Sequence, residues 1–214
     1  MEDLILNVFF YDIEKGFYID VGASDPNIIS VTKNFYLKGW NGINIEPLEK
    51  EYNNLMKERP KDINLKMCAG EREGFIEIYE GGVGTTSKSE YKVSNKTRNV
   101  TLKMLANICK EFVPKDEIIH FCKIDVEGGE REVLLGYDFE KYRPYVFCIE
   151  STVPGTFTPS HKLFEDILIK NDYEFVYQYQ INRFYIDKKN LELKERAKII
   201  PKYINEFRRR SHKI

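Results

Sequence analysis

Acidic and glycine residues follow a strand-like segment near the start of this sequence, a combination that suits the binding of a polar ligand. Residues 16–21 favour a strand, and residues 20–25 read Asp-Val-Gly-Ala-Ser-Asp. In an open α/β sheet, ligands bind beyond the carboxyl ends of the strands, where glycine lets them approach the backbone and the next helix offers free N–H groups. We therefore expect residues 20–25 to line a ligand site. A purely structural turn has the same pattern and is the alternative.

A second carboxylate stands where a ribose-binding acid is expected. Glu46 ends a predicted strand that starts at Trp40, and Pro47 opens the next predicted helix. In Rossmann-like sheets, an acid about 20 residues past the glycine turn accepts hydrogen bonds from both ribose hydroxyls of an adenosine cofactor. We favour this role for Glu46. The alternative is an exposed acid that the helix dipole stabilises.

Three more acids occur where later strands end. Asp125 and Glu127 follow a predicted buried strand over residues 118–124, and Glu150 ends another over residues 145–150. Carboxylates at these positions face the ligand crevice of such a sheet. His161 opens a predicted helix and is a fourth titratable candidate, with an ordinary helix N-terminal residue as the alternative.

A sheet must bring these side chains together, and the apolar pattern predicts one, because helical and strand-like segments alternate and end in a hairpin. This order predicts a doubly wound α/β sheet whose last strand is antiparallel. The predicted helices cover residues 4–9, 28–38, 48–59, 102–112, 130–137 and 161–168. The predicted strands cover residues 17–21, 40–46, 63–69, 75–79, 118–124, 145–150, 175–179 and 184–186.

Several details of these elements are open to a structural check. Ile28 is expected on the buried face of the helix over residues 28–38, and Leu163 on that of the helix over residues 161–168. A turn is expected at residues 180–183. From Leu191 onward, an amphipathic pattern is broken by Pro201.

Residues 81–99 form the longest loop-like region, rich in glycine and hydroxyl residues. The region lacks the Lys-Ser/Thr ending of a phosphate-binding P-loop. We expect a mobile lid or substrate loop here, with an ordinary surface loop as the alternative.

The composition limits the class of protein. With 214 residues we expect one domain, in which residues 1–15 hold a docking helix. A net charge of −1 predicts no nucleic-acid partner, and the Arg-rich end, residues 208–210, is expected to be solvated. Four scattered cysteines, an acidic start and no long apolar run predict a cytoplasmic chain without a membrane span. The oligomeric state is left open.

Taken together, these segments resemble the FkbM family of S-adenosylmethionine-dependent methyltransferases. The resemblance runs from about residue 16 to residue 150, and KIDVEGGE is its most specific part. The segments that carry it are FYIDVGA (17–23), GWNG (39–42), IEP (45–47), TL (101–102), KIDVEGGE (123–130) and VLLG (133–136).

The resemblance implies a class I, Rossmann-like methyltransferase fold and methyl transfer to a hydroxyl of a sugar, polysaccharide or related natural product. It places the methionine part of S-adenosylmethionine at Asp20, Gly22 and Ala23, the ribose at Glu46, adenine near Ala69 and Gly70, and the sulfonium near Asp125. Residues 151–214, which lie outside the strongest resemblance, would shape the acceptor pocket and end in a helical tail. The expected cofactor-binding residues are Asp20, Gly22, Ala23, Ser24, Glu46, Pro47, Ala69, Gly70 and Asp125.

Methyl transfer of this kind needs an aligned nucleophile and a group that accepts its proton. Asp125, Glu127, Glu150 and His161 are the candidate bases. Crowded carboxylates need either a raised pKa on one acid or a divalent cation such as Mg²⁺, unless Glu127 pairs with Lys123 or Arg131. We favour base catalysis without a metal, because no further Asp or Asn stands beside Glu150 in the sequence.

Two other classes of protein remain as alternatives. A nicotinamide-dependent oxidoreductase also uses a glycine turn and an acid such as Glu46, but its G-x-G-x-x-G pattern is broken after Gly22. A non-catalytic nucleotide-binding module with this fold does not require carboxylates at Asp125 and Glu127.

Overall fold

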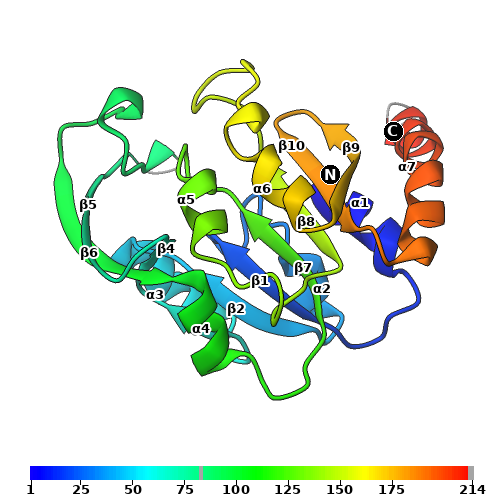
Figure 1. Cartoon of the computed structure of the whole chain (residues 1–214), viewed down its shortest axis with the longest axis horizontal. Helices are drawn as coiled ribbons and strands as arrows, with labels where there is room; N and C mark the ends of the chain where they lie inside the picture. The colour runs from blue at the N-terminus through cyan, green and yellow to red at the C-terminus, as the bar shows by residue number, and fades with distance from the viewer. Residues whose placement is uncertain (82–83, 212–214) are drawn as a thin grey trace.

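The computed structural model describes residues 1–81 and 84–211, whose strands form a seven-stranded sheet and a three-stranded sheet (Figure 1). The larger sheet has, in spatial order, β3 (Ile63–Leu65), β2 (Asn41–Ile45), β1 (Phe17–Val21), β7 (Ile119–Ile124), β8 (Val146–Glu150), β10 (Asn182–Asp187) and β9 (Tyr173–Tyr179). Strands β3 to β8 of this order pair in parallel, whereas β10 is antiparallel to both neighbours. The predicted doubly wound sheet with a closing antiparallel hairpin is confirmed.

The strand order reverses between β1 and β7, and this is where an open α/β sheet binds its ligand. Alternate residues of β1 serve opposite faces: Ile19 and Val21 pack into one apolar core and Tyr18 into the other. The first core lies under α4 (Leu105–Phe112), α5 (Glu130–Leu135) and α6 (Glu165–Lys170). The second lies under α1 (Glu2–Phe10), α2 (Lys33–Leu37) and α7 (Leu191–Ser211). Helix α3 (Glu49–Glu58) connects β2 to β3.

The smaller sheet projects beside the β3 edge and has the order β4 (Cys68–Gly70), β6 (Thr97–Met104), β5 (Gly74–Tyr79) (Figure 1). Its existence corrects the prediction of one strand over residues 63–69, because β3 ends at Leu65 and the chain then joins this second sheet. The predicted helix over residues 102–112 also starts too early. Leu102 lies in β6, opposite Gly74, and the helix begins at Leu105.

Three further expectations about helices were wrong. Residues 28–38 yield only the short α2, and Ile28 is 69% exposed. Leu163 is exposed in a 3₁₀ turn that precedes α6. Helix α7 continues through Pro201, because its apolar residues, including Ile200 and Ile204, are buried in the core shared with α1, and this burial offsets the missing backbone hydrogen bond.

The closing hairpin is tighter than predicted, since β10 already begins at Asn182.

In the part of the chain that the structure describes, no helix combines the length and apolarity needed to cross a membrane.

Candidate functional site

A row of polar side chains crosses the sheet near its carboxyl edge. The parallel register places Asn64 beside Asn44, Asn44 beside Asp20, and Asp20 beside Lys123. Because neighbours in register share a face, these side chains lie on the side of the sheet that α1 and α2 cover. The sheet therefore carries a buried polar layer directly below the ends of β1 and β7.

Lys123 ties the ends of these two strands together. Its Nζ lies 3.3 Å from Asp20 Oδ1 and 3.5 Å from Asp125 Oδ2, and it donates a 3.1 Å hydrogen bond to the Gly22 carbonyl oxygen. Burial alone would lower the pKa of Lys123, but the carboxylates of Asp20 and Asp125 outweigh burial and raise it. The Thr32 hydroxyl donates to Asp20 Oδ2 at 3.0 Å. Asp20 thus positions Lys123 and Thr32, and its predicted contact with methionine stays a prediction.

Gly22 allows the strand ends to approach closely. Its φ is +79°, and a Cβ at this position would lie 1.9 Å from the Asp125 carbonyl oxygen. The Gly22 and Ala23 N–H groups donate to the Ile45 carbonyl oxygen at 2.9 and 3.2 Å. A side chain here would push β1 away from the loop after β7. Both the positive φ and the lack of space therefore favour glycine at this position.

Glu46 is buried, with 5% of its surface exposed, so the alternative of an exposed helix-terminal acid was wrong. Its Oε2 accepts the Ser24 N–H and its Oε1 the Leu48 N–H, both at 2.8 Å. Burial raises the pKa of Glu46, and these two hydrogen bonds act in the opposite direction. Each oxygen keeps a further lone pair for a hydroxyl donor. Pro47 follows at the start of α3, and the predicted binding roles of Ser24 and Pro47 stay predictions.

Ala69 and Gly70, expected near adenine, lie in β4 of the smaller sheet. A Cβ at Gly70 would approach Leu102 Cδ1 to 2.8 Å, which gives this glycine a packing role. Burial raises the pKa of the preceding Cys68 to about 12, and the charge of Glu46 adds to that increase. Strand β4 therefore approaches the predicted ribose acid, while the adenine contact itself stays a prediction.

Three carboxylates converge past the ends of β7 and β8. Asp125, Glu127 and Glu150 each present an oxygen, and these oxygens lie within 4.8 Å of one another. Burial, followed by the charge of Asp125, raises the pKa of Glu127 to about 7 and that of Glu150 to about 10. The predicted gathering of these acids is confirmed.

The loop that carries Asp125 and Glu127 is shaped by Glu130. Glu130 Oε1 accepts the N–H groups of Val126 and Gly128, both at 3.1 Å, and these bonds support the positive φ of 55° at Glu127 and 99° at Gly128. Neither Lys123 nor Arg131 pairs with Glu127, because Lys123 contacts Asp125 and Arg131 contacts Asp166. Sequence reasoning missed this role of Glu130. The signal for it is an acid at the first helical residue, directly after two glycines.

The structure does not bring His161 into the carboxylate group. It starts a 3₁₀ turn, and burial together with the charge of Arg183 lowers its pKa while Glu165 opposes the decrease. His161 therefore lies near a different ion pair, that of Arg183 with Glu165.

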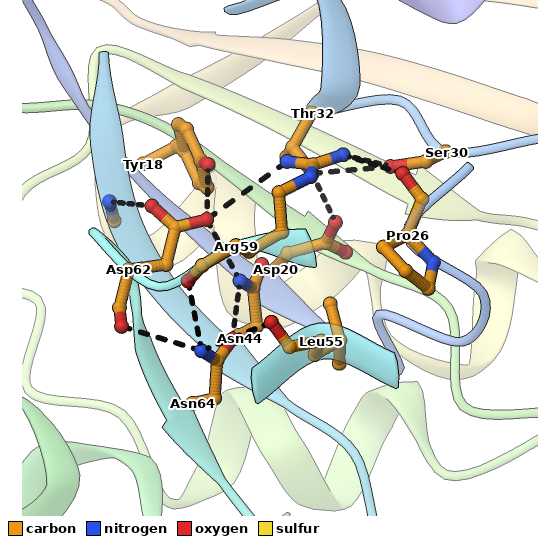
Figure 2. A network of polar contacts seen from close by, with 11 residues as sticks. Tyr18, Asp20, Pro26, Ser30, Thr32, Asn44, Leu55, Arg59, Asp62 and Asn64 are labelled. Carbon is orange, nitrogen blue, oxygen red and sulfur yellow. Dashed lines mark hydrogen bonds and ion pairs between the residues drawn. The ribbon is translucent and has the colours of Figure 1, made fainter. Parts of the chain in front are cut away.

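A buried network behind the site was not foreseen (Figure 2). Arg59, at the end of α3, donates to the Pro26 carbonyl oxygen at 2.7 Å and to Ser30 Oγ at 3.1 Å, and its Nη1 lies 3.8 Å from Asp62 Oδ2. Asp62 in turn accepts the Tyr18 hydroxyl at 2.7 Å. Arg59 thereby fixes the backbone that follows the glycine turn to the core of the sheet.

Comparison with known proteins identifies the family of this fold. A family model described as the FkbM methyltransferase domain matches residues 20–177. The fold is similar to the crystal structure of methyltransferase FkbM from Methylobacillus flagellatus KT, with a TM-score of 0.53 and 15% sequence identity. That match covers 85% of this chain and 47% of the other, so this chain spans about half of that protein's length. No curated protein sequence matches this chain.

The sheet order and the structural match define a methyltransferase fold. Because the family model covers most of the sequence, the chain belongs to the FkbM methyltransferase family.

Proposed function

We propose that the protein is an S-adenosylmethionine-dependent O-methyltransferase whose acceptor is a hydroxyl of a sugar, polysaccharide or related natural product. One observation carries the proposal: in a chain of the FkbM family, three carboxylates converge beside the glycine turn at the strand-order reversal. The acceptor class follows from the family resemblance.

The residues present fit the methyl donor. Gly22 lets the turn after β1 approach the loop after β7, at the strand-order reversal where such a sheet binds its ligand, and Glu46 keeps hydrogen-bonding capacity at the end of β2. Gly22, Ala23 and Ser24 would hold the methionine part, Glu46 and Pro47 the ribose, and β4 the region of adenine. When bound, S-adenosylmethionine supplies a methyl group bonded to a positively charged sulfur. The sulfur is a good leaving group, because it departs as the neutral thioether of S-adenosylhomocysteine.

The chain supplies alignment and a place for the proton. Asp125 and Glu127 are partly exposed, whereas Glu150 is buried behind them. An acceptor hydroxyl that enters from the exposed side meets Asp125 and Glu127 first, and a carboxylate within hydrogen-bond reach can accept its proton. The negative charge of this group also suits the positive sulfur of the donor.

The activity test is a screen of candidate glycans and polyols with S-adenosylmethionine, read by mass spectrometry for the mass of one added methyl group. Once an acceptor is found, the amide variants Asp125→Asn and Glu127→Gln are compared with the wild type. The variant that replaces the base should have a kcat lower by a factor of roughly 10²–10⁴. His161→Gln, outside the carboxylate group, should leave kcat near the wild-type value. Full activity in both amide variants would remove these carboxylates from the mechanism.

A further inference from the structure

We propose that Asp125, Glu127 and Glu150 bind one divalent cation that prefers oxygen ligands, such as Mg²⁺ or Mn²⁺. The spacing of the three carboxylate oxygens, all within 4.8 Å of one another, suits a shared ion. Around an octahedral Mg²⁺, oxygens on opposite sides lie roughly 4.2 Å apart and adjacent ones roughly 3 Å apart. At most one pair of the three oxygens can be opposite, so the carboxylates would close around the cation when it binds.

A second observation is the buried, unpartnered oxygen of Glu150. The Glu150 side chain is 5% exposed, yet its Oε2 has no hydrogen-bond partner among the described residues. Buried carboxylate oxygens are almost always paired, because leaving one unpaired costs the desolvation of that group. Since Glu150 points into the carboxylate group, a cation there would satisfy this oxygen.

Asn182 carries an unpartnered amide oxygen on the strand next to Glu150. It lies directly opposite Glu150 in the antiparallel register of β8 and β10, so the two side chains share a face of the sheet. Asn182 is 6% exposed, its Nδ2 donates to Glu2 Oε1, and its Oδ1 has no partner in the described part of the chain. Carboxylate and amide oxygens are the ligands that such cations prefer.

The position of Asn182 also removes the argument against a metal that the sequence analysis gave. That argument depended on the lack of an Asp or Asn beside Glu150 along the chain. The sheet register brings Asn182 to that place from a strand that begins over 30 residues later.

The local charge also favours a bound cation. Lys123 is shared between Asp20 and Asp125, while Glu127 and Glu150 form no ion pair within residues 1–81 and 84–211. Lys123 thus serves Asp20 and Asp125, and a divalent cation would supply the positive partner that Glu127 and Glu150 lack and would bind their ionised forms.

In catalysis the cation would bind the acceptor hydroxyl and lower its pKa, a role that rests on the methyl transfer proposed above. Cation binding itself does not depend on that proposal. The site can therefore be tested without an acceptor and without the methyl donor.

The test is titration of the full chain with Mn²⁺, with free Mn²⁺ measured by electron paramagnetic resonance. We expect one bound Mn²⁺ per chain, displaced by Mg²⁺, and at least roughly tenfold weaker binding in Glu150→Gln and Asp125→Asn. Asn182→Leu, which keeps the size but removes the oxygen, should also weaken binding. Glu140→Gln removes an exposed carboxylate elsewhere and should bind Mn²⁺ like the wild type.

Each variant is first checked for a wild-type melting transition. If Glu150→Gln does not fold, Asp125→Asn still tests the site, because the Asp125 side chain is partly exposed. The proposal is overturned if the wild type binds no Mn²⁺ at about 1 mM, the weak end of the affinity range of protein sites for hard cations, or if both acid variants bind it unchanged. S-adenosylhomocysteine binding, measured on the same samples with EDTA present, shows separately whether the donor site exists.

Discussion

At the residue scale, Gly22 is the position where the site tolerates a side chain least. Its substitution combines an unfavourable positive φ with a Cβ placed 1.9 Å from the Asp125 carbonyl oxygen. Gly155 provides a matched control, because its φ is +70° and a Cβ added there would meet nothing within 4 Å. Comparison of the two alanine variants separates backbone strain from the steric clash.

We expect Gly155→Ala to lower the free energy of unfolding by about 1 kcal/mol and Gly22→Ala by more than about 3 kcal/mol. Denaturant unfolding measures both values. Equal losses would mean that the close approach of β1 to the loop after β7 relaxes easily, contrary to the rigid site described here.

Glu46 is the residue on which donor affinity should depend most. Charge-assisted hydrogen bonds to the two ribose hydroxyls contribute on the order of 1.5–3 kcal/mol each, so Glu46→Ala should weaken S-adenosylhomocysteine binding at least about tenfold. Calorimetry measures the affinity. Glu58→Ala, an exposed acid at the end of α3, is the matched control, and unchanged affinity in the Glu46 variant would exclude Glu46 from the site.

At the scale of elements, the start of β7 contains a histidine that should make stability depend on pH. Burial lowers the pKa of His120, and its Nδ1 accepts the Phe17 N–H at 3.2 Å, which requires the neutral ring. At pH values above the ordinary histidine pKa, both folded and unfolded states are neutral here. As the pH falls through that value, only the unfolded state gains the proton, so the free energy of unfolding decreases.

His120→Gln should therefore show a smaller loss of stability than the wild type between about pH 7 and pH 5. Thermal or denaturant unfolding at several pH values checks the difference, since the carboxylates titrate equally in both proteins. Identical pH profiles would contradict a neutral, buried His120.

The segment between β5 and β6 lies beside α5 and contacts the acidic loop that precedes this helix (Figure 1). Thr86 Oγ1 donates to the Glu127 carbonyl oxygen at 2.6 Å, and the Tyr91 ring leaves no room for a Cβ at Gly128. Residues 82–83 of the predicted lid lie outside the described residues, and its last three residues, 97–99, belong to β6 and not to a loop, because they pair with β5. The described contacts connect the segment directly to the loop that carries Asp125 and Glu127.

If this segment closes over bound donor or acceptor, S-adenosylhomocysteine should slow proteolysis within residues 84–96. Cleavage in residues 114–117, at the opposite end of β7, serves as the control and should not change. Equally fast cleavage of residues 84–96 with and without the ligand would leave the segment an ordinary surface loop.

At the scale of the whole molecule, the sequence predicted what short-range patterns determine. Acids and glycines placed just after apolar runs located the ends of β1, β2, β7 and β8, because strand ends in a parallel sheet meet at one edge. The convergence of Asp125, Glu127 and Glu150 followed from that rule alone.

What sequence reasoning missed depends on contacts between distant segments. The pairing of Asn182 with Glu150 is set by the register of an antiparallel hairpin, and the ion pair of Lys123 with Asp20 by the neighbouring positions of β1 and β7. The continuation of α7 through Pro201 depends on packing against α1. Local propensity carries no information about any of these three.

The central claim is that the site beside the glycine turn after β1 binds S-adenosylmethionine. Calorimetric titration of the intact chain with S-adenosylmethionine and, separately, with NAD tests it most directly. The account predicts saturable binding of S-adenosylmethionine, weakened by Glu46→Ala, and no binding of NAD at the same concentrations. Binding of NAD without S-adenosylmethionine, or of neither ligand, would contradict it.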